Sequence, residues 1–333
     1  MKYYNPLTNT VSTSLQDSTW DCPLWEEPTI SENTAFDGPW QKFWDSVSLS
    51  AFQTCPRKYE WTVRQGWHLF PQPSTLTFGI DFHKVLEIWH KLLAHGLDKE
   101  TALLRCTKLA GLLGEQLIAN RTERTKETLV RCVVWYLDQF KNDNAVTTTR
   151  PNGTPAVEYS FTIPLMEVNG EQMFLSGHID RIVEFMGEVY ICDYKTTKSA
   201  LNEQFFGNFK PSTQISNYLL AAKIMAGTIS AIPRQPKGLI IDGIQLGVNF
   251  NRFNRSVIPF STLEINEHIN DLEGWLKLAA LCAEAEHWPG NPASCSNYGG
   301  CVFKSICSET PAKWERMLES NFTKSTWDPR KSR

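Results

Sequence analysis

The chain of 333 residues carries 33 basic and 36 acidic side chains, has a formal net charge of −3, and is 41% hydrophobic. These values are ordinary for a soluble globular protein that buries a substantial core in one large domain or two modest ones. A net charge this small excludes a basic field over the whole molecule, so nucleic-acid binding would need a local basic surface.

The sequence shows neither a membrane span nor an export signal. No apolar run reaches the 18 or so residues needed to cross a bilayer, so we expect no membrane partner. The first residues lack a charged segment followed by an apolar one. We therefore expect a cytoplasmic protein whose nine cysteines do not form disulfides.

The first half of the chain is predicted to be mostly helical. Residues 1–45 are polar, rich in Pro and Trp and without a sustained period, and we interpret them as an N-terminal extension. A short helix is predicted over residues 48–61, with Cys55 and Pro56 inside it. Patterns at about 99–118 and 125–141 extend a helical part over about 80–142. Its first helix is amphipathic, with apolar residues at a 3.6-residue period: Phe82, Val85, Leu86, Trp89, Leu92 and Leu93.

The second half is predicted to combine strands and helices. We expect strands at about 156–164, 171–185, 188–195, 238–249 and 253–261, and helices at about 212–226 and 263–286. This order predicts an α/β fold with a mixed central sheet, at about 155–262, flanked by helices. The predicted domain covers residues 46–310 and includes a cysteine-rich closing segment at 295–307, and a basic tail follows at 311–333.

Residues 177–197 are the most informative segment, because they are typical of two strands joined by a tight turn at Met186-Gly187. A two-residue turn places Asp180 opposite Asp193, with Cβ atoms about 4.5–5.5 Å apart. Two carboxylates that close repel by roughly 3 kcal/mol at an effective dielectric of 20, so a cation between them is expected. Lys195 projects from the same face as Asp193, because side chains alternate along a strand. The pattern therefore predicts a hydrolytic metal site.

The alternative is a solvated hairpin whose charges have no function. Apolar residues on both faces argue against it, since they indicate strands buried on both sides, where unpaired acids are costly. One face carries Ile182, Val189 and Ile191, and the other carries Ile179, Val183, Phe185, Tyr190 and Cys192. His178 faces the site in this register, opposite Lys195, but we expect a structural role for it.

Three cysteines near the end of the chain follow a C-x5-C-x5-C pattern. They are Cys295, Cys301 and Cys307, and Cys55 lies far upstream in a Cys-Pro-Arg sequence. Four thiolates in this arrangement suit an iron–sulfur cluster or zinc. The five-residue intervals are wider than in most zinc knuckles, which favours a cluster. Zinc and a simple loop of reduced cysteines stay open as alternatives.

Six motifs occur in order over about residues 46–308. A serine-rich helix leads into Cys-Pro-Arg and an aromatic residue, and the closing cysteines come last. Between them lie Gly79, His83, Leu86 and Glu87; then Gly177, Ile179, Asp180 and Arg181; then Asp193 and Lys195; then Gln214 and Tyr218. In this order the chain resembles the RecB-like branch of the PD-(D/E)XK nucleases with an iron–sulfur staple, which includes CRISPR-associated adaptation exonucleases, the AddB nuclease domain and phage exonucleases.

The resemblance implies a restriction-endonuclease-like fold with a helical insertion and a [4Fe-4S] staple on Cys55, Cys295, Cys301 and Cys307, with zinc as the alternative. It implies that Asp180, Asp193, His83 and the carbonyl of Tyr194 hold Mg²⁺ or Mn²⁺. Lys195 would activate the attacking water, and Gln214 and Tyr218 would hold DNA or the lysine. Glu158 is a further candidate acid.

The expected activity is that of a metal-dependent DNA exonuclease in recombination, repair or phage DNA processing, in a bacterium or a phage-infected cell. Expected DNA contacts come from basic residues: Arg57, Lys58, Arg121, Arg124, Lys198 and Lys210. The sequence has no G-x-x-x-x-G-K-[ST] loop, so a separate helicase or recombination protein is an expected partner, and a small-molecule substrate is not. The alternatives are a DNA-end-binding or adaptor protein that has lost cutting, and an interaction protein stapled by zinc.

Overall fold

The computed structural model describes residues 3–5, 10–12, 22–23, 36, 40–69, 74–117, 124–325 and 328–330. Most of the expected N-terminal extension, and Arg121, lie outside these ranges. Within them, β1 (Tyr3–Asn5), β2 (Thr10–Ser12) and β3 (Cys22–Pro23) form a small antiparallel sheet. No helix in the described ranges has the length and apolarity that a bilayer crossing requires.

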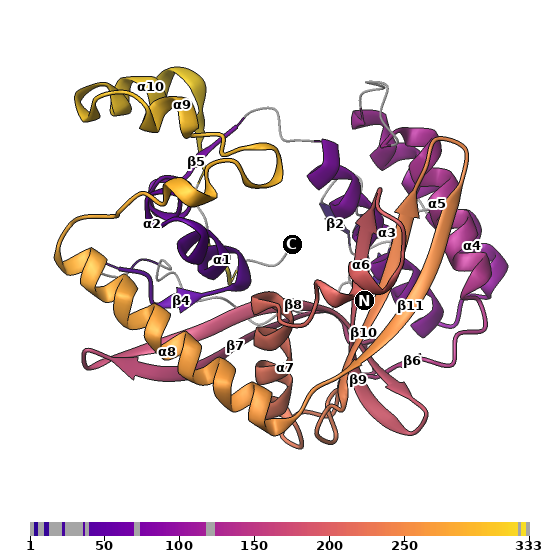
Figure 1. The fold of residues 1–333 in the computed structure, drawn as a ribbon. Helices are drawn as coiled ribbons and strands as arrows, with labels where there is room; N and C mark the ends of the chain where they lie inside the picture. The colour runs from indigo at the N-terminus through magenta and orange to yellow at the C-terminus, as the bar shows by residue number, and fades with distance from the viewer. Residues whose placement is uncertain are drawn as a thin grey trace.

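A mixed sheet of seven strands forms the centre of the molecule, as the sequence predicted (Figure 1). Its main path runs β11-β10-β9-β8-β4, and β6 and β7 also pair with β8. The β9–β10 and β4–β8 pairs are parallel, and the other pairs are antiparallel. The strands are β4 (Phe43–Trp44), β6 (Val146–Thr147), β7 (Val157–Val168), β8 (Glu171–Phe185), β9 (Glu188–Thr197), β10 (Gly238–Leu246) and β11 (Asn251–Pro259).

Helices cover both faces of this sheet. On one face, α7 (Thr213–Met225), α8 (Thr262–Glu284) and α1 (Ser46–Thr54) bury Ile182, Val189 and Ile191. On the other face lies a bundle of α3 (Ser74–Ala94), α4 (Lys99–Leu113) and α5 (Lys126–Gln139), which buries Val183 and Cys192. The strands are therefore buried on both sides, as the apolar pattern predicted. Ile179 is an exception, because it packs in the first core and not with Val183.

The β8–β9 hairpin has the predicted turn and register, but its ladder is shorter than expected. Pairing runs from Phe185–Glu188 to Arg181–Cys192. Beyond that pair the backbone ladder ends, and the carboxylate of Asp180 accepts the backbone N–H of Tyr194 at 3.0 Å. The predicted direct pairing of Asp180 with Asp193, and of His178 with Lys195, is therefore wrong.

The helix predicted over residues 48–61 is broken in two. It comprises α1, α2 (Pro56–Tyr59) and a π-helical turn, η1 (Glu60–Arg64). Cys55, between α1 and α2, is extended with φ −166° and ψ 113°. Proline has no N–H and disfavours helical backbone in the residue before it, which explains the break. The break turns the Cys55 thiol toward the C-terminal cysteines.

The C-terminal segment returns to this broken helix. After α8, η3 (Pro292–Ser294), η4 (Asn297–Gly299), α9 (Lys304–Cys307), η5 (Pro311–Lys313) and α10 (Trp314–Asn321) follow, and β12 (Thr323–Lys324) pairs with β5 (Trp67–His68). A separate core joins the two regions: Trp61, Trp67, Phe303, Ile306, Leu318 and Phe322. Two short elements complete the described part, η2 (Gly114–Gln116) and α6 (Glu203–Gly207).

Candidate active site

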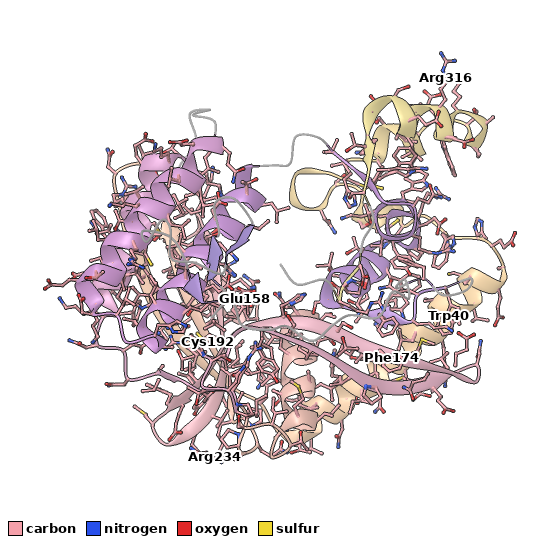
Figure 2. All side chains as sticks on the ribbon, turned by 180° about the vertical axis from the view of Figure 1, so that it is seen from behind. Trp40, Glu158, Phe174, Cys192, Arg234 and Arg316 are labelled. Atoms are coloured by element: carbon pink, nitrogen blue, oxygen red, sulfur yellow. The ribbon has the colours of Figure 1, made fainter. Side chains whose placement is uncertain are left out.

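All eight residues that the sequence predicts for catalysis or metal binding line one cavity of about 310 Å³. We call it the acidic cavity. It lies where α3, β7, β8, β9 and α7 meet, and Figure 2 shows Glu158 near the middle of the molecule, between the α3–α5 bundle and the α1–α2 region. The eight residues are His83, Glu158, Asp180, Asp193, Tyr194, Lys195, Gln214 and Tyr218.

Three of these side chains are close enough to share one metal ion. Ligand atoms of His83, Glu158 and Asp180 all lie within 4.8 Å of one another. His83 Nδ1 is 3.4 Å from Asp180 Oδ2 and 3.9 Å from Glu158 Oε1. Its other nitrogen, Nε2, lies 3.0 Å from the carbonyl oxygen of Tyr194. The predicted carbonyl ligand therefore faces the same histidine as the two acids.

The backbone of Glu158 is strained. Its φ of +42° lies in the left-handed region that residues other than glycine rarely adopt. The β7–β8 ladder pairs the residues on either side of it, Val157 with Arg181 and Tyr159 with Ile179, which places Glu158 across from Asp180. Such strain persists when the surrounding structure imposes it, and it is concentrated at functional sites. Here it accompanies the entry of a third carboxylate into the acidic cavity.

A chain of hydrogen bonds fixes the lysine of the site. Lys195 Nζ lies 2.7 Å from Asp193 Oδ2 and donates to Gln214 Oε1 at 2.9 Å. Gln214 Nε2 donates to the hydroxyl of Tyr218 at 3.1 Å. Gln214 and Tyr218 are one turn apart on α7, so they lie on the same face of this helix. Of this pair, which the sequence predicts to hold DNA or the lysine, Gln214 contacts the lysine and Tyr218 contacts Gln214.

Burial and neighbouring charges shift the pKa values of this site. Burial would lower the pKa of His83, but the carboxylates of Asp180, Glu158 and Asp193 raise it to about 9. Burial would raise the pKa of Asp180, but the adjacent histidine outweighs it and holds that pKa below the ordinary value. Burial raises the pKa of Asp193 to about 6, although Lys195 acts in the opposite direction. Without metal, His83 is therefore protonated at neutral pH.

Mn²⁺ binding is expected to release about one proton per ion at about pH 7.5, because a histidine ligand must be neutral and His83 keeps its proton up to a pKa of about 9. Below about pH 6 a second proton should come from Asp193. Isothermal titration calorimetry in two buffers of different ionisation enthalpy counts these protons. A His83→Gln variant should release none at the higher pH, and equal release from both proteins would contradict the assignment.

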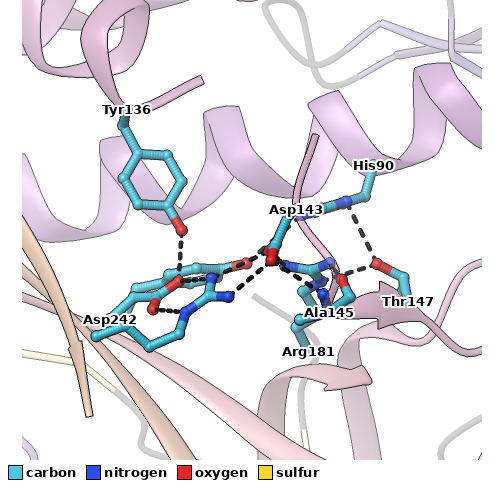
Figure 3. A network of polar contacts seen from close by, with 9 residues as sticks. His90, Tyr136, Asp143, Ala145, Thr147, Arg181 and Asp242 are labelled. Atoms are coloured by element: carbon cyan, nitrogen blue, oxygen red, sulfur yellow. Dashed lines mark hydrogen bonds and ion pairs between the residues drawn. The ribbon is translucent and has the colours of Figure 1, made fainter. Parts of the chain in front are cut away.

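A buried ion-pair network supports the strand that carries Asp180 (Figure 3). The next residue, Arg181, points toward the bundle, and its Nη1 lies 3.3 Å from Asp143 Oδ2. Asp143 also accepts from Arg255 at 2.7 and 3.0 Å, and this arginine donates to Asp242 Oδ2 at 2.7 Å. The hydroxyl of Tyr136 on α5 donates to the same oxygen at 2.6 Å. The network thereby joins β8, β10 and β11 to the helical bundle, with each buried charge paired.

The wall of the acidic cavity includes residues for which the sequence predicts no role, among them Glu87 and Lys84. Glu87, which lies in a motif but was given no role, is buried between Lys84 at 3.0 Å and Lys91 at 2.6 Å. Burial would raise its pKa, but the two lysines hold it below the ordinary value. Lys84 and Glu87 both line the acidic cavity. The signal was present in the spacing, since lysines three residues before and four after a glutamate share its helical face.

The basic residues predicted to contact DNA do not gather at the acidic cavity. Arg57 lies by the cysteines and stacks on the Trp314 ring at 4.6 Å, and Lys210 is paired with Glu264 at 2.6 Å. Lys198 is exposed at the end of β9, and Arg124 is buried. Lys58 lines a groove described below. His178 does not line the acidic cavity, and its ring bonds the Ser160 hydroxyl at 2.9 Å.

All four cysteines of the predicted staple line a second cavity, of about 330 Å³. Among the described residues, sets of three ligand atoms within 4.8 Å of one another occur at the acidic cavity and not among these thiols. The sulfur of Cys55 accepts the backbone N–H of Asn291 at 3.3 Å. The pKa of Cys307 is above its ordinary value, because the effect of burial exceeds the opposing effect of the nearby Arg57.

A mixed sheet flanked by helices, with Asp193 and Lys195 on one strand and Asp180 on its hairpin partner, is consistent with a restriction-endonuclease-like fold. Residues 46–308 match the PD-(D/E)XK nuclease superfamily, and the chain belongs to this superfamily.

No curated protein matches the chain. Among solved structures, the chain is similar to a candidate exonuclease from Eubacterium rectale, at 11% identity and a TM-score of 0.47, over 81% of this chain and 92% of that one. It is also similar to SSO0001, at 14% identity and a TM-score of 0.29, over 72% and 95% of the two chains.

Proposed function

We propose that this protein is a metal-dependent DNA exonuclease of recombination, repair or phage DNA processing. The observation that carries the proposal is the convergence, in one cavity, of residues from α3, β7, β8, β9 and α7. Among the groups that line it are the carboxylates of Glu158, Asp180 and Asp193, the imidazole of His83, and Lys195, which is held in place by two hydrogen-bonding partners. The order of the motifs along the chain supports action at DNA ends.

The donor set of the cavity fits Mg²⁺ or Mn²⁺. Carboxylate oxygens on Glu158, Asp180 and Asp193 and the carbonyl of Tyr194 are hard ligands of the kind both ions take, and an imidazole shifts the preference toward Mn²⁺. His83, Glu158 and Asp180, whose ligand atoms are already clustered, would hold the ion together with Asp193. When bound, such an ion neutralises charge on the phosphate and lowers the pKa of a bound water.

The chain's own residues would position the reacting groups. Lys195 places a positive charge beside Asp193 in the acidic cavity. There it can stabilise the negative charge that develops on a bound phosphate in the transition state. Because Gln214 accepts from the lysine and is itself held by Tyr218, the ammonium has little freedom to turn away. Its role is then to stabilise charge and to orient the attacking water.

We further propose that the four cysteines hold a [4Fe-4S] cluster. A zinc ion with bonds of about 2.3 Å to sulfur needs sulfur atoms roughly 3.8 Å apart, and the described thiols do not form so tight a set. A cubane cluster is larger and uses four cysteines, in agreement with the four that line this cavity. The cluster would fasten the C-terminal segment to Cys55 as a structural staple.

The test is digestion of linear DNA, single- and double-stranded and labelled at either end, with Mg²⁺ or Mn²⁺. We expect stepwise loss of nucleotides from an end, and none with chelator. The competing function is a DNA-end-binding protein without cutting, as the sequence also allowed. Binding of labelled ends without any metal-dependent product would favour that alternative, and cutting only at internal positions would contradict the exonuclease proposal.

A further inference from the structure

The serine-rich helix is the motif that the proposed chemistry leaves unexplained. Its buried face carries Ser48, Leu49 and Phe52, and Ser48 completes a capping box with Asp45. The opposite face of α1 lines a groove of about 570 Å³. Residues of α2 and η1 and residues 212–214, at the start of α7, also line it.

One wall of this groove has a repeating polar pattern. Every fourth residue from 46 onward is hydroxylic or basic, and all five members of the series line the groove: Ser46, Ser50, Thr54, Lys58 and Thr62. Within one helical segment a spacing of four keeps side chains on one face, so Ser46, Ser50 and Thr54 share a face of α1, and Lys58 and Thr62 share a face of α2 and η1. The break at Cys55 separates these two sets, and both line the groove. Hydroxyls and lysines in a row are the groups that contact the sugar–phosphate backbone without reading sequence.

The charge of the groove differs from that of the acidic cavity. Among the residues of its lining that the structure describes, none is a carboxylate and Lys58 is the one permanently charged member. The acidic cavity, by contrast, contains the carboxylates of Glu158, Asp180 and Asp193, which a metal ion must balance, and that of Glu87, which two lysines balance. A polyanion would therefore meet repulsion in the metal-free cavity and none in the groove.

The groove and the acidic cavity adjoin at Gln214. Gln214 lines both, and its amide oxygen accepts from Lys195 at 2.9 Å. Ser212 and Thr213, immediately before it, form the wall opposite α1. A strand whose scissile phosphate lies at Lys195 would therefore pass Gln214 directly into the groove.

We infer that this groove holds the sugar–phosphate backbone of one DNA strand on its way to or from the acidic cavity. The inference rests on the proposed nuclease function, which it deepens by assigning the path of the substrate. The serine-rich helix is then a phosphate-contacting surface, and Lys58 is its charged anchor. Binding along the groove is independent of base sequence, because its polar groups suit phosphate oxygens and not base edges.

The experiment measures strand binding separately from cutting. On an Asp193→Asn background, a fluorescent single-stranded oligonucleotide is titrated and its anisotropy is read at several salt concentrations. Ser50→Glu, which places a negative charge in the groove, should weaken binding about tenfold. Lys58→Gln should reduce the slope of log affinity against log salt by about 0.7, the value for one phosphate contact on a single strand. Thr101→Glu, an equally small change at an exposed position of α4, should bind like the parent.

Each outcome decides one of the two claims. If Ser50→Glu and Lys58→Gln bind the oligonucleotide like the parent, the groove is not the strand path, whether or not the unmodified protein cuts DNA. If both variants bind more weakly but the unmodified protein shows no metal-dependent cutting, the strand path holds and the nuclease proposal fails. A parent that binds no DNA at all overturns both.

Discussion

An Asp193→Asn variant is expected to digest DNA at least about a thousandfold more slowly than the unmodified protein, the equivalent of about 4 kcal/mol in the activation barrier. The substitution removes a charge that pairs with Lys195 at 2.7 Å and that faces Asp180 across the acidic cavity. It keeps the size of the side chain, so the sheet should pack as before. The measurement is the rate of nucleotide release from end-labelled DNA with Mn²⁺.

The same variant should not lose stability in the absence of metal. The pKa of Asp193, about 6, lies above its ordinary value, so its contribution to folding is present below that ordinary value and is lost as pH rises through about 6. An amide cannot ionise and avoids this loss, so the variant's thermal midpoint at neutral pH should equal or exceed the parent's. Mn²⁺ should raise the midpoint of the parent and not that of the variant.

Asp81→Asn is the matched control for this experiment. Asp81 is also buried, on α3, and burial also raises its pKa to about 6, but it does not line the acidic cavity. Digestion by this variant should match that of the unmodified protein. If the Asp193→Asn variant digests DNA as fast as the unmodified protein, the carboxylate of Asp193 takes no part in the chemistry. If the Asp81→Asn variant loses as much activity as Asp193→Asn, the loss of a buried acid alone explains the effect.

A Cys55→Ser variant is expected to lose both the colour of the cluster and much of the stability of the C-terminal closure. A metal centre that joins Cys55 to Cys295 closes a loop of about 240 residues. The loop-closure entropy of such a link stabilises the folded state by up to about 5 kcal/mol. Anaerobically purified protein should be brown with absorbance near about 400 nm, and the variant colourless with a clearly lower thermal midpoint.

Cys282→Ala controls for the loss of a buried thiol. Cys282 lies on the buried face of α8, packs in the first core and does not line the cysteine cavity. This variant should keep the brown colour, with a small decrease in stability of about 1 kcal/mol. Stoichiometric zinc and no iron in the unmodified protein would contradict the cluster, and unchanged stability of Cys55→Ser would contradict the staple.

Much of the fold follows from local patterns in the sequence. The alternating apolar residues of β8 and β9 and the turn at Met186-Gly187 predicted the hairpin register, which the pairs from Arg181–Cys192 to Phe185–Glu188 confirm. The apolar pattern did not predict the end of that ladder, beyond which the side chain of Asp180 accepts a backbone hydrogen bond. The break at Cys55 was predictable in principle from Pro56, but the helical pattern on both sides concealed it.

The candidate site was predictable as a set of residues but not as an arrangement. The motifs contain or enclose seven of the eight predicted residues, and Glu158 was a further candidate acid. All eight line the acidic cavity, although they come from five separate elements. Which of them touch was beyond the sequence, since long-range packing sets the contact of Gln214 with Lys195 and the left-handed backbone of Glu158. The basic residues were the weakest prediction, because a lysine's sequence context does not show whether an acid such as Glu264 will pair with it.

Anomalous diffraction from Mn²⁺-loaded crystals tests the central claim most directly, because it locates the ion without reference to activity. We expect a peak within about 2.5 Å of oxygen atoms of both Asp180 and Asp193, with the imidazole of His83 turned toward it. A fully loaded crystal with its manganese elsewhere, or with these two carboxylates too far apart to contact one ion, would contradict the metal site and the nuclease chemistry proposed for it.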